Sequence, residues 1–204
     1  MRLLLIRHGE SVGNVEGRYQ GHTDYPLTER GRDQARRLAR RLADVPLAAV
    51  YTSTLARAAQ TAAAIAEPHG LPVADLPDVR EYDVGPAISG LTWREVRERH
   101  PEVWAAFRER SGPYPALPGE EGREAFRARV CAALWALEAP HPDGVVAVVT
   151  HGGPIAVFCL AVLGLPYRRP LPFQLDNASL TAVEVRDGRG ALLTVNDTCH
   201  LVPE

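Results

Sequence analysis

Short apolar runs and helical patterns alternate along the chain. Runs without polar interruption occupy residues 3–6, 47–51 and 145–149. Such runs are typical of strands buried on both faces, as in parallel sheets. Apolar residues at helical spacing follow the first strand, in 35–42, and precede the third, in 126–137. The pattern therefore predicts an α/β domain with parallel strands, whose ligand site lies beyond the carboxyl ends of the strands.

Three helical segments are expected after the opening strand. Thr28 is a candidate N-cap for the helix that contains residues 35–42. An alanine-rich helix follows Ser53 and ends near residues 68–70, where Pro and Gly occur. Residues 72–90 are rich in Pro, Gly and Asp, so we expect a loop. The capping box Thr92-x-x-Glu95 then opens a helical segment that reaches Tyr114.

The C-terminal part continues the pattern. Pro154 stands where a first helical residue is expected, at the start of an apolar helix that runs to Leu163. Residues 179–185 and 191–195 form two expected strands, joined by the hairpin signal at 187–190. The aromatic residues of the helical segment are expected in the core; they are Trp93, Trp104, Phe107 and Tyr114.

Composition limits the class of protein and its partners. The 204 residues suit one domain, with 46% hydrophobic residues and a formal net charge of −2, so neither nucleic acid nor a membrane surface is expected as a partner. The first apolar run is too short for a signal peptide, and we expect a cytoplasmic protein. Cys131, Cys159 and Cys199 have no metal-binding spacing and are expected as small core residues.

The chain has no lysine, and all 23 of its basic residues are arginine. Schiff-base chemistry and the lysine of P-loop proteins are therefore excluded. A phosphate site in this chain must use arginine, whose planar fork binds phosphate through two hydrogen bonds. Arg57 is a candidate because it falls in the first turn of a helix, where unpaired N–H groups already favour anions.

Two histidines follow strands that we expect to be neighbours. His8 comes after the first strand within Arg7-His8-Gly9, and His151 comes after the run 145–149. His8 is the candidate nucleophile, because neighbouring arginines disfavour its protonated form. Arg7, Arg57 and His151 would supply hydrogen-bond donors and positive charge to a phosphoryl group.

Glu81 is the candidate acid and base of this site. A carboxyl group beside a phosphate dianion holds its proton more readily, so Glu81 could protonate the leaving group and then deprotonate water. No metal or cofactor is needed for these steps. A competing pattern, Gly9-Glu10-Ser11-Val12-Gly13, matches the nucleophile elbow of serine hydrolases. It comes too early in the chain for that fold, and we disfavour it.

Taken together, these segments resemble the histidine phosphatase superfamily, also called the phosphoglycerate mutase-like family. The resemblance rests on an ordered series of blocks: Leu5-Ile6-Arg7-His8-Gly9-Glu10-Ser11 with Asn14, residues 17–35, residues 53–62, Arg80-Glu81, Thr150-His151-Gly152-Gly153 and Asn177-x-Ser179. It implies a three-layer α/β/α sandwich around a mainly parallel sheet, formed by a single domain of residues 1–204. A helical insertion at about 82–120 would cover the site.

The resemblance also implies the roles of the site residues. His8 would be the phosphorylated nucleophile and Glu81 the acid and base. The phosphate and substrate would be bound by Arg7, Asn14, Gln20, Gly21, Arg57, His151 and Gly152. Residues 85–90 and 118–122 depart from the family's usual pattern after the acid and before the next helix. These departures leave the substrate open.

The resemblance favours a phosphomonoester hydrolase that acts on a small phosphorylated metabolite through a phosphohistidine. Two alternatives remain: a phosphoglycerate mutase and a non-catalytic binding module of the same fold. The mutases of the family use lysine and a longer insertion, which this chain lacks, and a module would be expected to lose His8 or Glu81. The protein could be a monomer or a homodimer.

Overall fold

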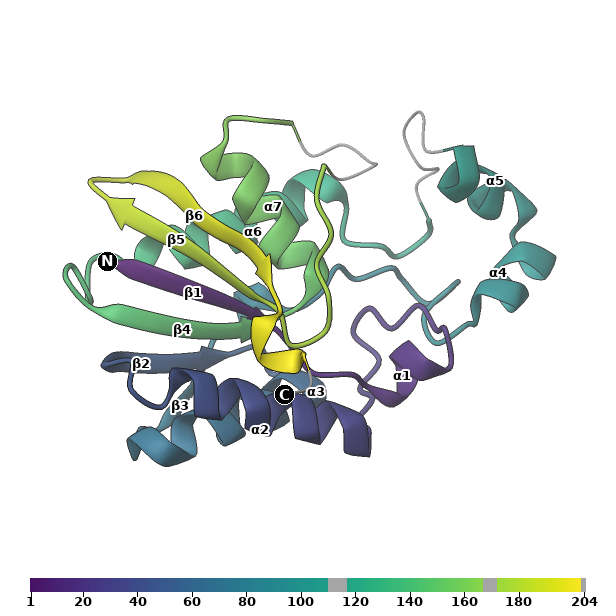
Figure 1. The fold of residues 1–204 in the computed structure, drawn as a ribbon. Coiled ribbons are helices and arrows are strands. Elements are labelled where there is room, and N and C mark those ends of the chain that lie inside the picture. The colour runs from purple at the N-terminus through teal and green to yellow at the C-terminus, as the bar shows by residue number, and fades with distance from the viewer. Residues whose placement is uncertain (110–116, 167–171, 203–204) are drawn as a thin grey trace.

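A six-stranded sheet with the order β3-β2-β4-β1-β5-β6 forms the centre of the computed structural model, which describes residues 1–109, 117–166 and 172–202 (Figure 1). The strands are β1 (Arg2–Arg7), β2 (Leu47–Thr52), β3 (Val73–Asp75), β4 (Val145–Thr150), β5 (Leu180–Arg186) and β6 (Arg189–Asp197). The first four strands are parallel, whereas β5 is antiparallel to β1 and β6 is antiparallel to β5. The sheet is therefore mainly parallel, as predicted.

Helices cover both faces of the sheet. They are α1 (Val12–Val15), α2 (Glu29–Leu42), α3 (Ala56–Ala66), α4 (Trp93–Arg99), α5 (Pro101–Glu109), α6 (Arg123–Ala136) and α7 (Gly152–Val162), with the 3₁₀ turns η1 (Glu67–His69), η2 (Pro77–Val79) and η3 (Cys199–Leu201). One face packs against α2 and α3, and the other against α6 and α7. Helices α4 and α5 lie beyond the end of the sheet where β1 and β4 finish (Figure 1). The three-layer sandwich is confirmed.

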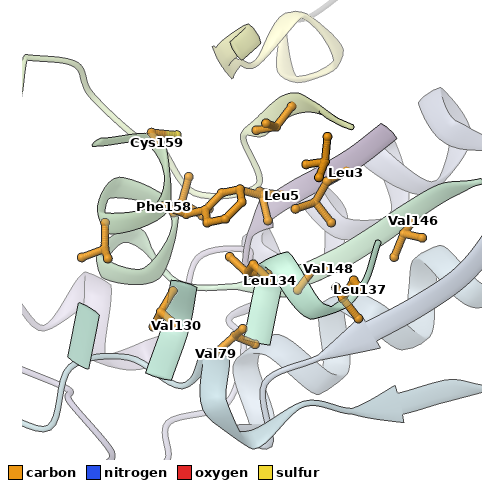
Figure 2. Packing of buried hydrophobic residues seen from close by; sticks show 14 of the residues in the cluster. Leu3, Leu5, Val79, Val130, Leu134, Leu137, Val146, Val148, Phe158 and Cys159 are labelled. Atoms are coloured by element: carbon orange, nitrogen blue, oxygen red, sulfur yellow. The ribbon is translucent and has the colours of Figure 1, made fainter. Parts of the chain in front are cut away.

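The uninterrupted apolar run of β1 supplies both halves of the core. Leu3 and Leu5 join Val148 and the α6 and α7 side chains on one face (Figure 2). Leu4 and Ile6 point to the opposite face, toward α2 and α3, because successive side chains alternate along a strand. All four are at most 5% exposed. Burying each contributes about 1.5–3 kcal/mol, so the strand that carries His8 is held firmly.

Capping predictions at two helices are confirmed. The Thr28 side chain accepts a hydrogen bond from the Gly31 N–H at the start of α2. Thr92 and Glu95 form the reciprocal capping box that begins α4. The C-terminal hairpin is also present, and Asp187 and Gly188 have the positive φ angles that tight hairpin turns require.

The structure corrects the expectations about one loop, one helix start and two cysteines. The expected loop 72–90 contains β3 and η2, because a strand of three residues between prolines pairs with β2 and lacks a periodic pattern of its own. Helix α7 begins at Gly152, so Pro154 is its third residue. Cys199 is exposed and Cys131 half-buried; only Cys159 lies in the core.

Helices α4 and α5 occupy the region expected to be helical, whereas Tyr114 lies outside the described residues. Within the described ranges, no helix has both the length and the apolar character needed to cross a membrane.

Candidate active site

The sheet brings the two histidines together at a topological switch point. Strands β1 and β4 are neighbours, with Arg7 opposite Thr150 in their register, so the next residue of each strand is a histidine. After β1 the chain leads to α2 on one face, and after β4 it leads to α7 on the other. Ligands bind at such points in α/β sheets. The rings of His8 and His151 are 5.1 Å apart and meet edge to face, as their shared position predicts.

His8 is neutral and has a defined tautomer. Burial, followed by the charges of Arg57 and Arg7, holds its pKa well below the usual value. Its Nδ1 lies 2.6 Å from the Gly9 carbonyl oxygen, which can only accept a hydrogen bond. Nδ1 therefore carries the one proton of the neutral ring, and Nε2 keeps a lone pair. His8 lines the cavity described below, so its Nε2 is suited to attack a ligand there.

His151 packs edge to face against His8 and is fully buried. Burial and the nearby charge of Arg57 lower its pKa well below the usual value. Its Nε2 is 2.8 Å from the Ser53 Oγ, which already accepts a hydrogen bond from the Leu55 N–H. The Ser53 hydroxyl can donate its proton to Nε2, and in that tautomer the His151 Nδ1 carries the ring proton and is a donor.

Arg57 is 1% exposed and is fixed by the loop that precedes α2. Its Nη1 donates to the Thr23 carbonyl at 3.0 Å and its Nη2 to the Gly21 carbonyl at 2.9 Å. Burial lowers its pKa to about 10, so it keeps its charge at neutral pH. Gly21 thus orients Arg57, a role that the sequence did not predict for it.

Arg7 is held by the segment that precedes β5. Its Nη1 donates to the Leu175 carbonyl, and burial lowers its pKa, an effect that the nearby carboxylates of Glu81 and Asp176 oppose. The Nε atoms of Arg7 and Arg57 and the Nδ1 of His151 are buried and have no hydrogen-bond partner in the described part of the protein. All three residues were predicted to bind phosphate.

Glu81 reaches the site from the segment that follows η2. Its Oε1 accepts a hydrogen bond from the Tyr82 N–H at 2.9 Å, and its Oε2 accepts one from the Gly153 N–H at 3.2 Å. A Cβ atom on Gly153 would lie 2.0 Å from the Glu81 Oε1. Gly153 is therefore needed for the carboxylate to occupy this place beside the first turn of α7.

Asn14 and Gln20 enter the cavity from the segment after β1. The Asn14 Oδ1 accepts hydrogen bonds from the Ser11 N–H and the Asn177 amide, so its Nδ2 is the group left for a ligand. The Gln20 Oε1 likewise accepts from the Ser11 hydroxyl at 2.8 Å. Ser11 is completely buried and caps α1, so the serine-hydrolase interpretation is wrong.

A cavity of 630 Å³ joins these residues to an outer, largely apolar wall. Every predicted site residue except His151 lines it, and the wall is formed mainly by Tyr19, Tyr82, Val84, Ile88, Trp93, Val103, Leu117 and Phe173. Trp93 is 47% exposed and packs on Tyr19, with ring centres 4.2 Å apart. The expectation that Trp93 belongs to the core was wrong.

Three residues of the site were missed as functional residues. Ser53, Gly153 and Asn177 all lie within the sequence blocks that carry the family resemblance, which is the signal that could have identified them. Asn177 donates to the carbonyl of His8 at 3.1 Å and so supports the nucleophile's backbone. Within the described residues, no group of three or more His, Cys, Asp or Glu side chains is arranged to hold a metal ion.

Known proteins share both the sequence and the fold of this chain. Phosphoserine phosphatase 1 of Hydrogenobacter thermophilus is 35% identical over 201 residues, which cover 98% of this chain and 94% of the relative. The adenosylcobalamin/alpha-ribazole phosphatase of Salmonella typhimurium is 30% identical over 210 residues and is covered completely. The solved structure of Bacillus stearothermophilus YhfR superposes with a TM-score of 0.91, at 33% identity, over 98% of this chain and 99% of that one.

The family model agrees with these likenesses. The model of the histidine phosphatase superfamily (branch 1) matches residues 3–198, which include both histidines and Glu81. The chain is therefore a member of the histidine phosphatase superfamily, as the blocks around Arg7-His8-Gly9 and His151 indicated.

Proposed function

We propose that the protein hydrolyses phosphomonoesters of small metabolites through a phosphohistidine at His8. One observation carries the proposal. Buried donors of Arg7, Arg57 and His151 have no partner in the described part of the protein, and they surround a neutral histidine with a free lone pair. Unpaired buried donors are costly. A bound phosphoryl group would satisfy them and stand beside the nucleophile.

The first step transfers the phosphoryl group to the enzyme. The His8 Nε2 forms a bond to phosphorus while the bond from phosphorus to the ester oxygen breaks. Glu81 gives its proton to that oxygen, so the leaving group departs as an alcohol. The two arginines and His151 bind the equatorial oxygens, where charge is concentrated in the transition state.

The second step frees the enzyme. Glu81, now ionised, takes a proton from water, and the water oxygen attacks phosphorus as the bond to the His8 Nε2 breaks. Inorganic phosphate leaves, and Glu81 is again protonated. Both steps use groups of this chain, and the scheme requires no cofactor.

The apolar wall is suited to the alcohol part of the substrate. Tyr19 and Trp93 present aromatic surface to the cavity at the outer end of the site. Tyr82, next to Glu81, hydrogen-bonds Glu120, and burial raises the pKa of its phenol. We infer that the phosphate end is fixed by charge, whereas the wall selects the rest of the metabolite.

The measurement that tests the function compares two reactions of the same enzyme. Purified protein is offered a panel of phosphomonoesters, which includes phosphoserine and aryl phosphates, and inorganic phosphate is measured. In parallel, phosphoglycerates are supplied with bisphosphoglycerate, and their interconversion is followed. We expect phosphate release to exceed interconversion, whereas the opposite order would favour the mutase. Activity in neither assay would favour the non-catalytic module.

We also propose that the protein is cytoplasmic. With a formal net charge of −2, it is proposed to have neither a nucleic-acid nor a membrane partner. Monomer and homodimer are both compatible with the proposed chemistry, because every residue it uses comes from one chain.

A further inference from the structure

A partly buried arginine–carboxylate pair lies against the loop that carries Glu81. The Arg129 Nε donates to the Glu121 Oε2, and its Nη2 to the Glu121 Oε1, both at 2.7 Å. The two side chains are only 20% and 18% exposed. Neither lines the cavity. The contact has the two-bond fork geometry that arginine forms with carboxylates and lysine cannot.

The same guanidinium binds the backbone before the acid and at the acid itself. Its Nη1 donates to the carbonyl oxygens of Asp78, at 2.6 Å, and Arg80, at 3.0 Å. Its Nη2 donates to the carbonyl oxygen of Glu81 itself, at 3.0 Å. The guanidinium carbon also lies 4.9 Å from the centre of the Phe126 ring. Because these bonds use main-chain oxygens, the Glu81 carboxylate remains available to the cavity.

Glu121 holds the other end of the loop. Its Oε1 accepts a hydrogen bond from the Asp83 N–H at 2.9 Å, and its own N–H donates to the Asp83 carbonyl at 3.2 Å. Arg129 and Glu121 together therefore fix residues 78–83. We call this pair the loop clamp.

The loop clamp lies beside both segments that depart from the family's pattern. A Cβ on Gly85 would lie 2.8 Å from the Glu120 nitrogen, and one on Gly119 would lie 2.9 Å from the Pro86 ring. Residues 85–90 and 118–122 thus pack against each other next to Asp83 and Glu121. Despite the altered sequence, Glu81 keeps its contact with the Gly153 N–H.

We propose that Arg129, through its pair with Glu121, is the positioning residue that sets where the Glu81 carboxyl group stands relative to the leaving oxygen. The inference rests on the proposed hydrolysis, in which Glu81 protonates that oxygen. A general acid must be within hydrogen-bond reach of the atom that it protonates. The three hydrogen bonds from Arg129 to the carbonyl oxygens of residues 78, 80 and 81 keep the Glu81 carboxyl group in place. Without them the loop could shift and carry the carboxyl group with it.

The test is the Arg129→Lys enzyme, measured on aryl and alkyl phosphates of graded leaving-group acidity. Poor alkyl leaving groups need the acid most. We expect kcat/KM to fall about 10- to 100-fold for them and less than about threefold for 4-nitrophenyl phosphate. Glu121→Gln should change the dependence of kcat/KM on leaving-group acidity in the same direction, by a smaller factor. Arg127→Lys is the matched control, because Arg127 lies on the same helix and contacts Cys131.

A double-mutant cycle distinguishes positioning from general destabilisation. In the Glu81→Gln background, Arg129→Lys should lower kcat/KM by less than about twofold, because the group that it positions is already absent. An undiminished further loss in that background, or equal losses for all leaving groups, would overturn the proposal. If Arg129→Lys does not fold, Glu121→Gln takes its place in the same cycle.

The outcomes for the clamp and for the function are separable. A wild-type enzyme that releases no phosphate from any ester would refute the proposed hydrolysis. A wild-type enzyme that is active, together with an Arg129→Lys enzyme of unchanged leaving-group dependence, would refute the loop clamp alone.

Discussion

Replacement of Gly153 by alanine should displace the proposed acid without removing it. The new Cβ would lie 2.0 Å from the Glu81 Oε1 and 3.1 Å from the Phe126 Cζ. Ordinary contact begins at 3.4 Å, so either the carboxylate or the start of α7 must move by about 1.4 Å. Phe126 is fully buried, whereas the Glu81 Oε1 is the far end of a flexible side chain. The Glu81 carboxylate is therefore expected to move.

The expected cost follows from the displacement. A misplacement of about 1 Å can lower a rate by about 100-fold, which corresponds to about 2.7 kcal/mol of transition-state stabilisation. We expect Gly153→Ala to lose about this much in kcat/KM for alkyl phosphates, and much less for 4-nitrophenyl phosphate. The free energy of unfolding should change little, because the higher helix propensity of alanine, about 1 kcal/mol over glycine, offsets the cost of the close contact.

The assay measures phosphate release from alkyl phosphates and from 4-nitrophenyl phosphate. Thermal unfolding of each variant measures its stability. Gly152→Ala is the comparison, since its Cβ would come no closer than 3.8 Å, to the Arg7 Nε. Any loss in that variant should be equal for all leaving groups. If Gly153→Ala kept the wild-type rate on alkyl phosphates, the assignment of Glu81 as the acid would be wrong.

Three other perturbations test separate parts of the site and core. Ser53→Ala should lower the rate of phosphoryl transfer by about tenfold with little change in KM, because His151 loses the partner that leaves its Nδ1 as a donor. Rapid-quench kinetics measure this rate, and rescue by Ser53→Thr would support the role of the hydroxyl. The pKa values of His8 and His151 are lowered in the folded state, so the unfolded state binds more protons below about pH 6.5. The free energy of unfolding should therefore fall as the pH drops through that value, and denaturation in urea at pH 5 and pH 7 measures this fall. Phe158→Ala should cost about 3–5 kcal/mol in the same denaturation experiment, because its ring is completely buried between α7 and the sheet.

The location of the site was predictable because it depends on local patterns. Two buried apolar runs that each end at a histidine place those histidines at one edge of a parallel sheet, and β1 and β4 are indeed neighbours. Arg57 was predictable from its place in a helix's first turn. Such inferences need only the spacing along each segment.

The supporting contacts were not predictable because they join distant parts of the chain. Ser53 meets His151 across 98 positions, and Gly153 meets Glu81 across 72. Hydrophobic spacing and capping patterns do not distinguish them from other serines and glycines, and only their place within the blocks of the family resemblance marks them. Trp93 was assigned to the core because helical spacing does not reveal that its neighbour is the cavity wall at Tyr19. Tertiary packing alone decides these positions.

The central claim is that His8 becomes phosphorylated during turnover. Wild-type enzyme mixed with a ³²P-labelled phosphomonoester and quenched within milliseconds should carry an alkali-stable, acid-labile phosphate, which peptide mapping by mass spectrometry should locate on His8. The His8→Ala enzyme should carry none. Phosphate release by a wild-type enzyme that never carries this label, or an unchanged label in His8→Ala, would contradict the account.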